Sequence, residues 1–219
     1  MTPPRVLVIG CGALGRELVA LQRLAGGRWT LTCLPAIWHN TPEKIAGGVA
    51  AKLARAKGRF DAVLVAYGDC GTGGALDAVI AAAGADGLAV SRIDGPHCYR
   101  FFMGAAAFDA MTDADPAIFF VTDYLVRHFD RLIIKGLGLD RFPELLPVYF
   151  GNYSRLVYLA QSRDAALATK ARAAAARLGL AFTGVDTGYG ELADFIAGTN
   201  RAASPQTLES GTAALARAT

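Results

Sequence analysis

Short apolar runs alternate with amphipathic segments along most of the chain. The first run, residues 5–10 (RVLVIG), is continuous and rich in β-branched residues, which is typical of a strand covered on both faces. Leu14, Leu18 and Leu21 follow at helical spacing, so the chain opens with a strand, a loop and a helix. The same pattern predicts six further strands, at residues 30–34, 61–66, 88–91, 118–121, 156–160 and 180–185.

Strands that alternate with helices predict an α/β fold with a mostly parallel, Rossmann-like sheet and helices on both of its faces. We expect a single domain over residues 1–200, followed by a loose C-terminal tail at 201–219. Residues 136–152, which include Pro143 and Pro147, are the least regular part of the chain. The domain could therefore instead form two lobes, at about 1–112 and 113–200.

The charged residues favour a small molecule or a protein as the partner. The 219-residue chain has a net charge of only +3, and its basic residues are scattered, so we expect neither nucleic acid nor a membrane surface to be bound. No apolar run approaches the roughly 20 residues that span a bilayer, and no signal-peptide pattern opens the chain. These features predict a cytoplasmic protein, in which cysteines are more often structural thiols, catalytic groups or metal ligands than disulfides.

The turn after the first strand matches the dinucleotide-binding pattern G-x-G-x-x-G through Gly10, Gly12 and Gly15. That pattern also requires an acidic residue about 20 positions further on, at the end of the second strand. Residues 32–36 (TCLPA) contain neither an acid nor an arginine that would suggest NADP. We therefore do not expect NAD as the cofactor, although an NAD(P)-dependent oxidoreductase remains an alternative hypothesis, and tight packing by small residues would explain the glycines equally well.

Cysteines follow three of the predicted strands at the edge where parallel sheets bind ligands. Cys11 follows the first strand, Cys70 the third and Cys98 the fourth, while His39 lies in the loop after the second. Thiolate and imidazole groups hold zinc and iron-sulfur clusters, and three thiolates can leave one coordination position open for catalysis. The alternative for each is an ordinary buried side chain, which is the simpler interpretation of Cys33, within the second strand.

The glycine-rich stretch around Cys70 suggests how a cofactor could come close to that thiol. Gly71 and Gly73 allow positive φ angles and leave room for a ligand near the following helix. Asp69 and Asp94 lie in the same two loops as Cys70 and Cys98 and could orient ligands or move protons as catalytic groups. Aspartates in such loops more often cap turns and helices.

Three motifs together resemble the uncharacterised family called domain of unknown function 1638. They are LP followed by HNTPEKI within residues 34–45, YGDCG at 67–71, and a segment at 92–98 that begins with Arg and ends with HC. The resemblance extends over about residues 5–195. It implies an association with corrinoid-dependent methyl transfer, and the matching polar residues are Cys11, His39, Cys70 and Cys98, whereas Cys33 is not part of the pattern.

The leading hypothesis is a metal-site protein that holds an iron-sulfur cluster or zinc and acts in or beside corrinoid-dependent methyl transfer. Its partner would then be a small molecule or a corrinoid or methyltransferase protein. A non-catalytic accessory protein of a methyltransferase system is the other alternative, so an enzymatic activity is not assumed.

Overall fold

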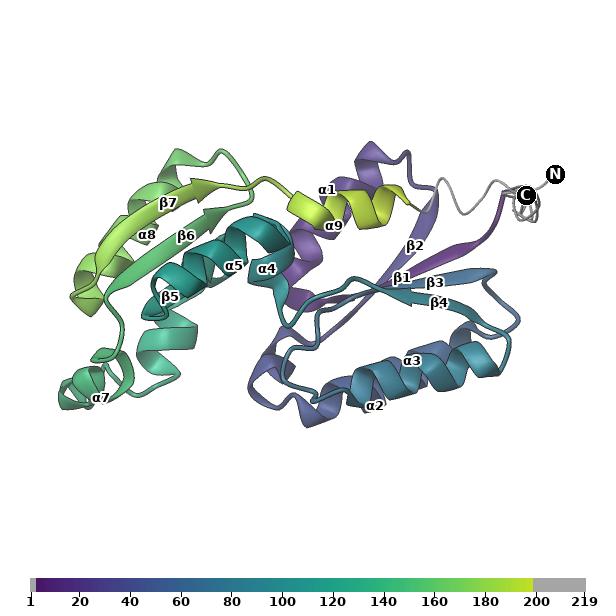
Figure 1. Cartoon of the computed structure of the whole chain (residues 1–219), viewed down its shortest axis with the longest axis horizontal. Helices are drawn as coiled ribbons and strands as arrows, with labels where there is room; N and C mark the ends of the chain where they lie inside the picture. The colour runs from purple at the N-terminus through teal and green to yellow at the C-terminus, as the bar shows by residue number, and fades with distance from the viewer. Residues whose placement is uncertain (1–2, 199–219) are drawn as a thin grey trace, which may run out of the picture.

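The computed structural model describes residues 3–198 and contains two sheets, in each of which all strands are parallel (Figure 1). The first sheet has the strand order β2-β1-β3-β4 and the second the order β5-β6-β7. The predicted parallel α/β fold is confirmed, whereas residues 201–219, expected to form a tail, lie outside the described part. The strands are β1 (Val6–Cys11), β2 (Trp29–Leu34), β3 (Ala62–Ala66), β4 (Ala89–Arg92), β5 (Ile118–Thr122), β6 (Arg155–Ala160) and β7 (Ala181–Asp186).

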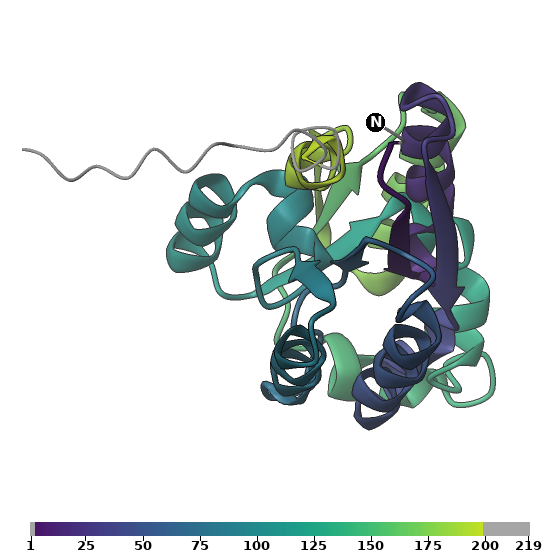
Figure 2. The same cartoon turned by 90° about the vertical axis from the view of Figure 1, so that its right-hand side faces the viewer.

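Helices cover both faces of the first sheet. Helices α2 (Glu43–Ala56) and α3 (Ala75–Ala85) lie side by side against one face, as Figure 2 shows. Helices α1 (Gly15–Leu24) and α9 (Gly190–Ala197) lie on the opposite face (Figure 1). The second sheet packs against α8 (Ala165–Leu178) and α6 (Asp123–Arg127).

The remaining helical segments are short, and within residues 3–198 no helix has the length and apolar character needed to cross a membrane. They are α4 (Cys98–Met103), α5 (Ala105–Ala114), α7 (Leu146–Phe150), the 3-10 turns η1 (Gly12–Leu14), η2 (Ala36–Asn40) and η4 (Pro143–Leu145), and the π-helical turn η3 (Asp130–Lys135).

Alternate residues of β1 enter two different hydrophobic cores. Leu7 and Ile9 pack in the core beneath α2 and α3, whereas Val6 and Val8 pack in the core on the other side. Successive side chains of a strand point to opposite faces, so a strand covered on both faces must be apolar at every position. This burial explains the uninterrupted apolar sequence of the strand.

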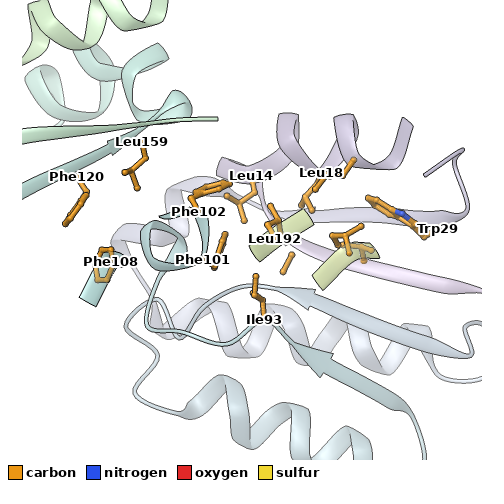
Figure 3. Packing of buried hydrophobic residues seen from close by; sticks show 14 of the residues in the cluster. Leu14, Leu18, Trp29, Ile93, Phe101, Phe102, Phe108, Phe120, Leu159 and Leu192 are labelled. Carbon is orange, nitrogen blue, oxygen red and sulfur yellow. The ribbon is translucent and has the colours of Figure 1, made fainter. Parts of the chain in front are cut away.

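One central core joins the two sheets. Phe101 and Phe102 of α4 are fully buried there together with Leu14, which precedes α1, and Leu192 of α9. Figure 3 shows these four side chains between the two sheets, with Phe120 of β5 on the side of the second sheet. Because residues from both sheets bury their apolar area in this core, neither sheet packs independently of the other.

A buried carboxylate fixes the carboxyl ends of β5 and β6. Asp123 is only 1% exposed, and its Oδ1 accepts hydrogen bonds from the Tyr158 hydroxyl at 2.6 Å and the Gln161 N–H at 3.2 Å. Its Oδ2 accepts from the Ser162 N–H at 3.1 Å and from the Ser162 hydroxyl. The backbone N–H of Asp123 in turn donates to Gln161 Oε1 at 2.8 Å. Asp123 therefore holds the turns after two neighbouring strands in one arrangement.

We expect Asp123→Ala to lower the free energy of unfolding by about 3 kcal/mol, because it leaves several buried donors without an acceptor. Urea denaturation followed by circular dichroism measures this loss. The matched control is Asp130→Ala, since Asp130 is exposed and, within residues 3–198, forms an ion pair only with the exposed Arg177. The control should cost less than about 1 kcal/mol, and equal losses for the two variants would contradict the role assigned to Asp123.

Candidate functional site

The register of the first sheet places the carboxyl ends of its strands at the same edge of the sheet. Gly10 of β1 lies beside both Cys33 of β2 and Ala66 of β3, so the chain leaves these three strands at the same edge. Val65 of β3 lies beside Arg92 of β4, which adds the loop after β4 to the group. Four loops that are distant in the sequence therefore converge at the carboxyl edge of this sheet, where parallel sheets bind ligands.

The converging loops form a small pocket, here called the cysteine pocket. Each of the four predicted metal ligands, Cys11, His39, Cys70 and Cys98, lines it. Its volume of about 70 Å³ has room for a metal ion or a few water molecules and is far below the several hundred Å³ of pockets that enclose a large cofactor. The other lining residues are Ala13, Leu14, Ala66, Tyr67, Gly68, Tyr99, Phe101, Thr122, Tyr124 and Leu125.

The second sheet closes one side of the cysteine pocket. Thr122 ends β5, and Tyr124 and Leu125 follow it in α6. These three residues carry no local sequence signal of their role, because nothing near them in the chain indicates that β5 ends against the first sheet. Their position directly after a parallel strand was the only available signal.

Backbone hydrogen bonds tie the loop that carries Cys70 to the loop that precedes Cys98. The Asp69 N–H donates to the Gly95 carbonyl at 2.9 Å, and the Cys70 N–H donates to the Pro96 carbonyl at 2.7 Å. Cys70 itself has a φ of +51°, a left-handed conformation that costs free energy in any residue with a side chain. The surrounding hydrogen bonds hold this thiol at the pocket despite the strain.

Arg92 contacts the same two loops and α3. Its guanidinium pairs with Asp77 of α3, with 2.7 Å between Arg92 Nε and Asp77 Oδ1, and donates to the Ile93 carbonyl at 2.9 Å. Longer contacts of 3.5 Å reach the carbonyls of Tyr67 and Gly95. The arginine at the start of the 92–98 motif thus positions the chain around Cys70 and Cys98.

Burial keeps the three thiols of the pocket protonated. It raises the pKa of Cys11, and together with the negative charge that Cys11 would carry it raises the pKa of Cys70 to about 12. Burial also raises the pKa of Cys98 well above its usual range, and the charges of Cys70 and Cys11 add to this effect. These mutual effects mean that the three sulfur atoms cannot all be thiolates unless a cation compensates their charge.

Two further polar groups, one in the pocket lining and one on the residue that precedes Cys98, are buried without a normal hydrogen bond to residues 3–198. The Tyr67 hydroxyl is one, and burial followed by the charge of Cys11 raises its pKa. The second is His97 Nδ1, whose ring packs 5.2 Å from Tyr99 and 5.1 Å from Phe108, measured between ring centroids. Burial lowers the pKa of His97, so the ring is neutral at physiological pH.

The two predicted catalytic aspartates do not line the cysteine pocket. Asp69 accepts hydrogen bonds from the Thr72 hydroxyl at 2.6 Å and from the N–H groups of Gly73 and Gly74 at 3.2 and 3.0 Å. These bonds lower its pKa and make Asp69 the cap of the glycine-rich loop. The side chain of Asp94 is 93% exposed and lies 4.0 Å from Arg100.

The glycines of this loop have the conformations that the sequence predicts. Gly71 has a φ of +81° and Gly73 a φ of +61°. Neither glycine is among the residues that line the cysteine pocket. Their role as contacts for a cofactor stays a prediction.

The glycine pattern at the start of the chain serves close packing at Gly12. A Cβ atom on Gly12 would lie 2.8 Å from the Leu34 carbonyl and 3.0 Å from the Ala36 N, so the chain itself occupies the space beside this residue. Gly10 ends the apolar part of β1, and Gly15 begins α1 and faces open space. In proteins with this pattern, a dinucleotide comes close to the glycine backbone. Here the backbone at the end of β2 makes that close approach to Gly12 instead.

The side chains of the pocket do not already form a metal site. In the part of the chain that the structure describes, no group of three or more His, Cys, Asp or Glu side chains has the arrangement required to hold a metal ion. Cys33 does not line the pocket. A metal bound by the predicted ligands would therefore require side-chain rotations about the Cα–Cβ bonds.

The fold and this pocket define the molecule as a parallel α/β protein with three thiols and an imidazole at the carboxyl edge of one sheet. Residues 33–196 match the family described as Protein of unknown function (DUF1638), and the chain belongs to this family. The matched segment includes His39, Cys70 and Cys98, whereas Cys11 precedes it. No curated protein and no solved structure shows significant similarity to the chain.

We expect Gly68→Ala to disturb the pocket and to lower the free energy of unfolding by about 1–3 kcal/mol. The added Cβ would lie 2.8 Å from the His97 N and 2.9 Å from the Gly95 carbonyl, and neither backbone atom can turn away. Chemical denaturation measures the loss. In the control variant Gly47→Ala, within α2, the Cβ would meet no atom within 4 Å, and helix propensity should stabilise the protein by about 0.5–1 kcal/mol. Unchanged stability of Gly68→Ala would contradict the tight loop contact.

Proposed function

We propose that the cysteine pocket binds zinc or an iron-sulfur cluster through Cys11, Cys70, Cys98 and His39. The observation that carries the proposal is the convergence of these four residues, from four separate loops, on one pocket. Their donor chemistry suits a thiophilic metal, since thiolates and imidazole are the preferred ligands of zinc and iron-sulfur centres. The Tyr67 hydroxyl on the same wall interacts with Cys11 but makes no hydrogen bond of normal geometry within residues 3–198, so it is a further polar group that a bound species could satisfy.

The chain would make specific contributions to such a centre. Arg92 and the hydrogen bonds between residues 69–70 and 95–96 would hold the two loops that bear Cys70 and Cys98. The aromatic wall from Tyr99 and Phe101, together with the second sheet, would exclude water. Zinc in this position would supply a Lewis acid that lowers the pKa of a bound thiol, and an iron-sulfur cluster would supply electron transfer.

Protein purified without oxygen tests the metal centre directly. We expect about one zinc ion or one cluster per chain, measured by elemental analysis and visible absorption. Cys70→Ser should lose most of this metal, because it removes one of the three thiolates. Cys33→Ser is the matched control and should retain the metal, since Cys33 lies outside the pocket lining. Wild-type protein that takes up neither zinc nor iron and sulfide under these conditions would refute the proposal.

We further propose that this centre acts in or beside corrinoid-dependent methyl transfer, as the family resemblance implies. In the simplest reaction, the methyl group of methylcob(III)alamin would pass as a methyl cation to the sulfur of a thiol substrate. The electron pair of the cobalt–carbon bond would remain on cobalt and give cob(I)alamin, while the thiol proton would leave to solvent. The partner protein would then be one that carries a corrinoid.

Spectroscopy of methylcobalamin tests this second step. With a small thiol and no oxygen, we expect the zinc-loaded protein to speed the loss of the methylcob(III)alamin absorbance by at least about tenfold over the metal-free protein. The Cys70→Ser variant should behave like the metal-free protein, and Cys33→Ser like the wild type. Equal rates for all four samples, with metal content verified, would leave a metal site without this activity and would favour an accessory role.

A further inference from the structure

A polar cleft lies between the two sheets, separate from the cysteine pocket. It is lined by the first turns of α1 on one side and by the turns after β5, β6 and β7 on the other, and it encloses about 500 Å³. The second sheet therefore has its own opening at the carboxyl ends of its strands, the position at which parallel sheets bind ligands. Gly15, the last glycine of the dinucleotide-binding pattern, lines this cleft, whereas the residues of the proposed metal centre do not.

Glu17 is a buried carboxyl group in the wall of the cleft. It lies in the first turn of α1, is only 6% exposed, and its Oε2 has no hydrogen-bond partner among residues 3–198. Burial raises its pKa and the negative charge of Asp123 adds to the rise, whereas a hydrogen bond from its own backbone N–H and the positive charges of Arg127 and Arg16 lower the pKa. A buried carboxyl oxygen without a partner is unusual in a folded protein and calls for a bound group.

Arg127 of α6 lines the same cleft and also has unused hydrogen-bonding capacity. Its Nε is buried without a hydrogen-bond partner in the described part of the chain. Its Nη2 forms ion pairs with Asp123 Oδ2 at 3.7 Å and with Asp164 Oδ2 at 3.8 Å, and both distances are longer than a hydrogen bond. Asp123 already accepts four hydrogen bonds from other groups, so it is not a full partner for this guanidinium.

Glu17 and Arg127 line one cleft without pairing with each other. Within residues 3–198, no ion pair of 4.0 Å or less joins them, although each is close enough to affect the other electrostatically. An anionic group and a cationic group that are held apart across a cleft complement a ligand that carries both charges.

We propose that this cleft binds a small zwitterion with an ammonium and a carboxylate group, such as a free α-amino acid. The ammonium group donates to the Glu17 carboxylate, and the ligand carboxylate accepts from the Arg127 guanidinium, with the positive charge of Arg16 adding to the attraction. The side chains of Glu17 and Arg127, in which Oε2 and Nε have no hydrogen-bond partner among residues 3–198, thereby each gain a charged hydrogen bond. The cleft and the cysteine pocket have no lining residue in common, so either proposal can fail without the other.

Isothermal titration calorimetry with the proteinogenic α-amino acids, each tested separately on the full-length protein, examines this proposal. We expect at least one of them to bind with a Kd below about 1 mM. Glu17→Gln and Arg127→Gln should each weaken that binding by at least about tenfold. The matched controls Glu43→Gln, in the first turn of α2, and Arg131→Gln, four residues after Arg127, should leave it unchanged, because neither residue lines the cleft.

Chemically altered ligands test the proposal even if the Glu17 and Arg127 variants fail to fold. The N-acetylated form of the bound amino acid lacks the ammonium group, and the corresponding amine lacks the carboxylate, so each should bind the wild type at least about tenfold more weakly. No binding of any amino acid at about 10 mM would overturn the proposal. Equal binding of the acetylated form would also overturn it, because the cleft would then be a site for anions alone.

Discussion

The packing of Phe101 and Phe102 between the two sheets is the interaction on which the rest of the molecule depends. These rings bury their whole surface in a core to which α1, α9 and both sheets contribute. Fully buried aromatic side chains each contribute several kcal/mol of stability, and their loss would expose apolar surface from both halves of the protein at once. Cys98 begins the same short helix, so the core that joins the sheets also fixes one wall of the cysteine pocket.

This shared core produces two openings with opposite chemical character. In the cysteine pocket, apolar and aromatic residues surround three thiols and exclude water from them. In the absence of a cation, this burial favours the protonated, neutral form of the thiols. In the wider polar cleft, Glu17 and Arg127 keep opposite charges apart. The turn η1 lines the cysteine pocket and the start of α1, which follows it, lines the cleft. Helix α6 lines both openings, so a change in how the sheets pack would alter both.

The three-dimensional structure changes the interpretation of two sequence motifs. The dinucleotide pattern has its glycines in the expected turn, yet the space beside Gly12 is filled by the backbone that leaves β2. Asp69 directly precedes the pocket residue Cys70, yet its carboxylate oxygens already accept hydrogen bonds from the Thr72 hydroxyl and two backbone N–H groups. A motif defines the local conformation of a turn, whereas its chemistry depends on which segment or ligand approaches that turn from elsewhere in the chain.

The sequence by itself determined the seven strands, their parallel arrangement and the loops that carry Cys11, His39, Cys70 and Cys98. These features follow from hydrophobic periodicity and from the rule that strands alternating with helices run parallel, both of which act over short distances along the chain. Only the tertiary structure decided that the strands divide into two sheets, that Tyr124 closes the cysteine pocket, and that Glu17 and Arg127 share a cleft. These outcomes depend on side chains more than a hundred residues apart that bury apolar surface together, and no local pattern encodes such contacts.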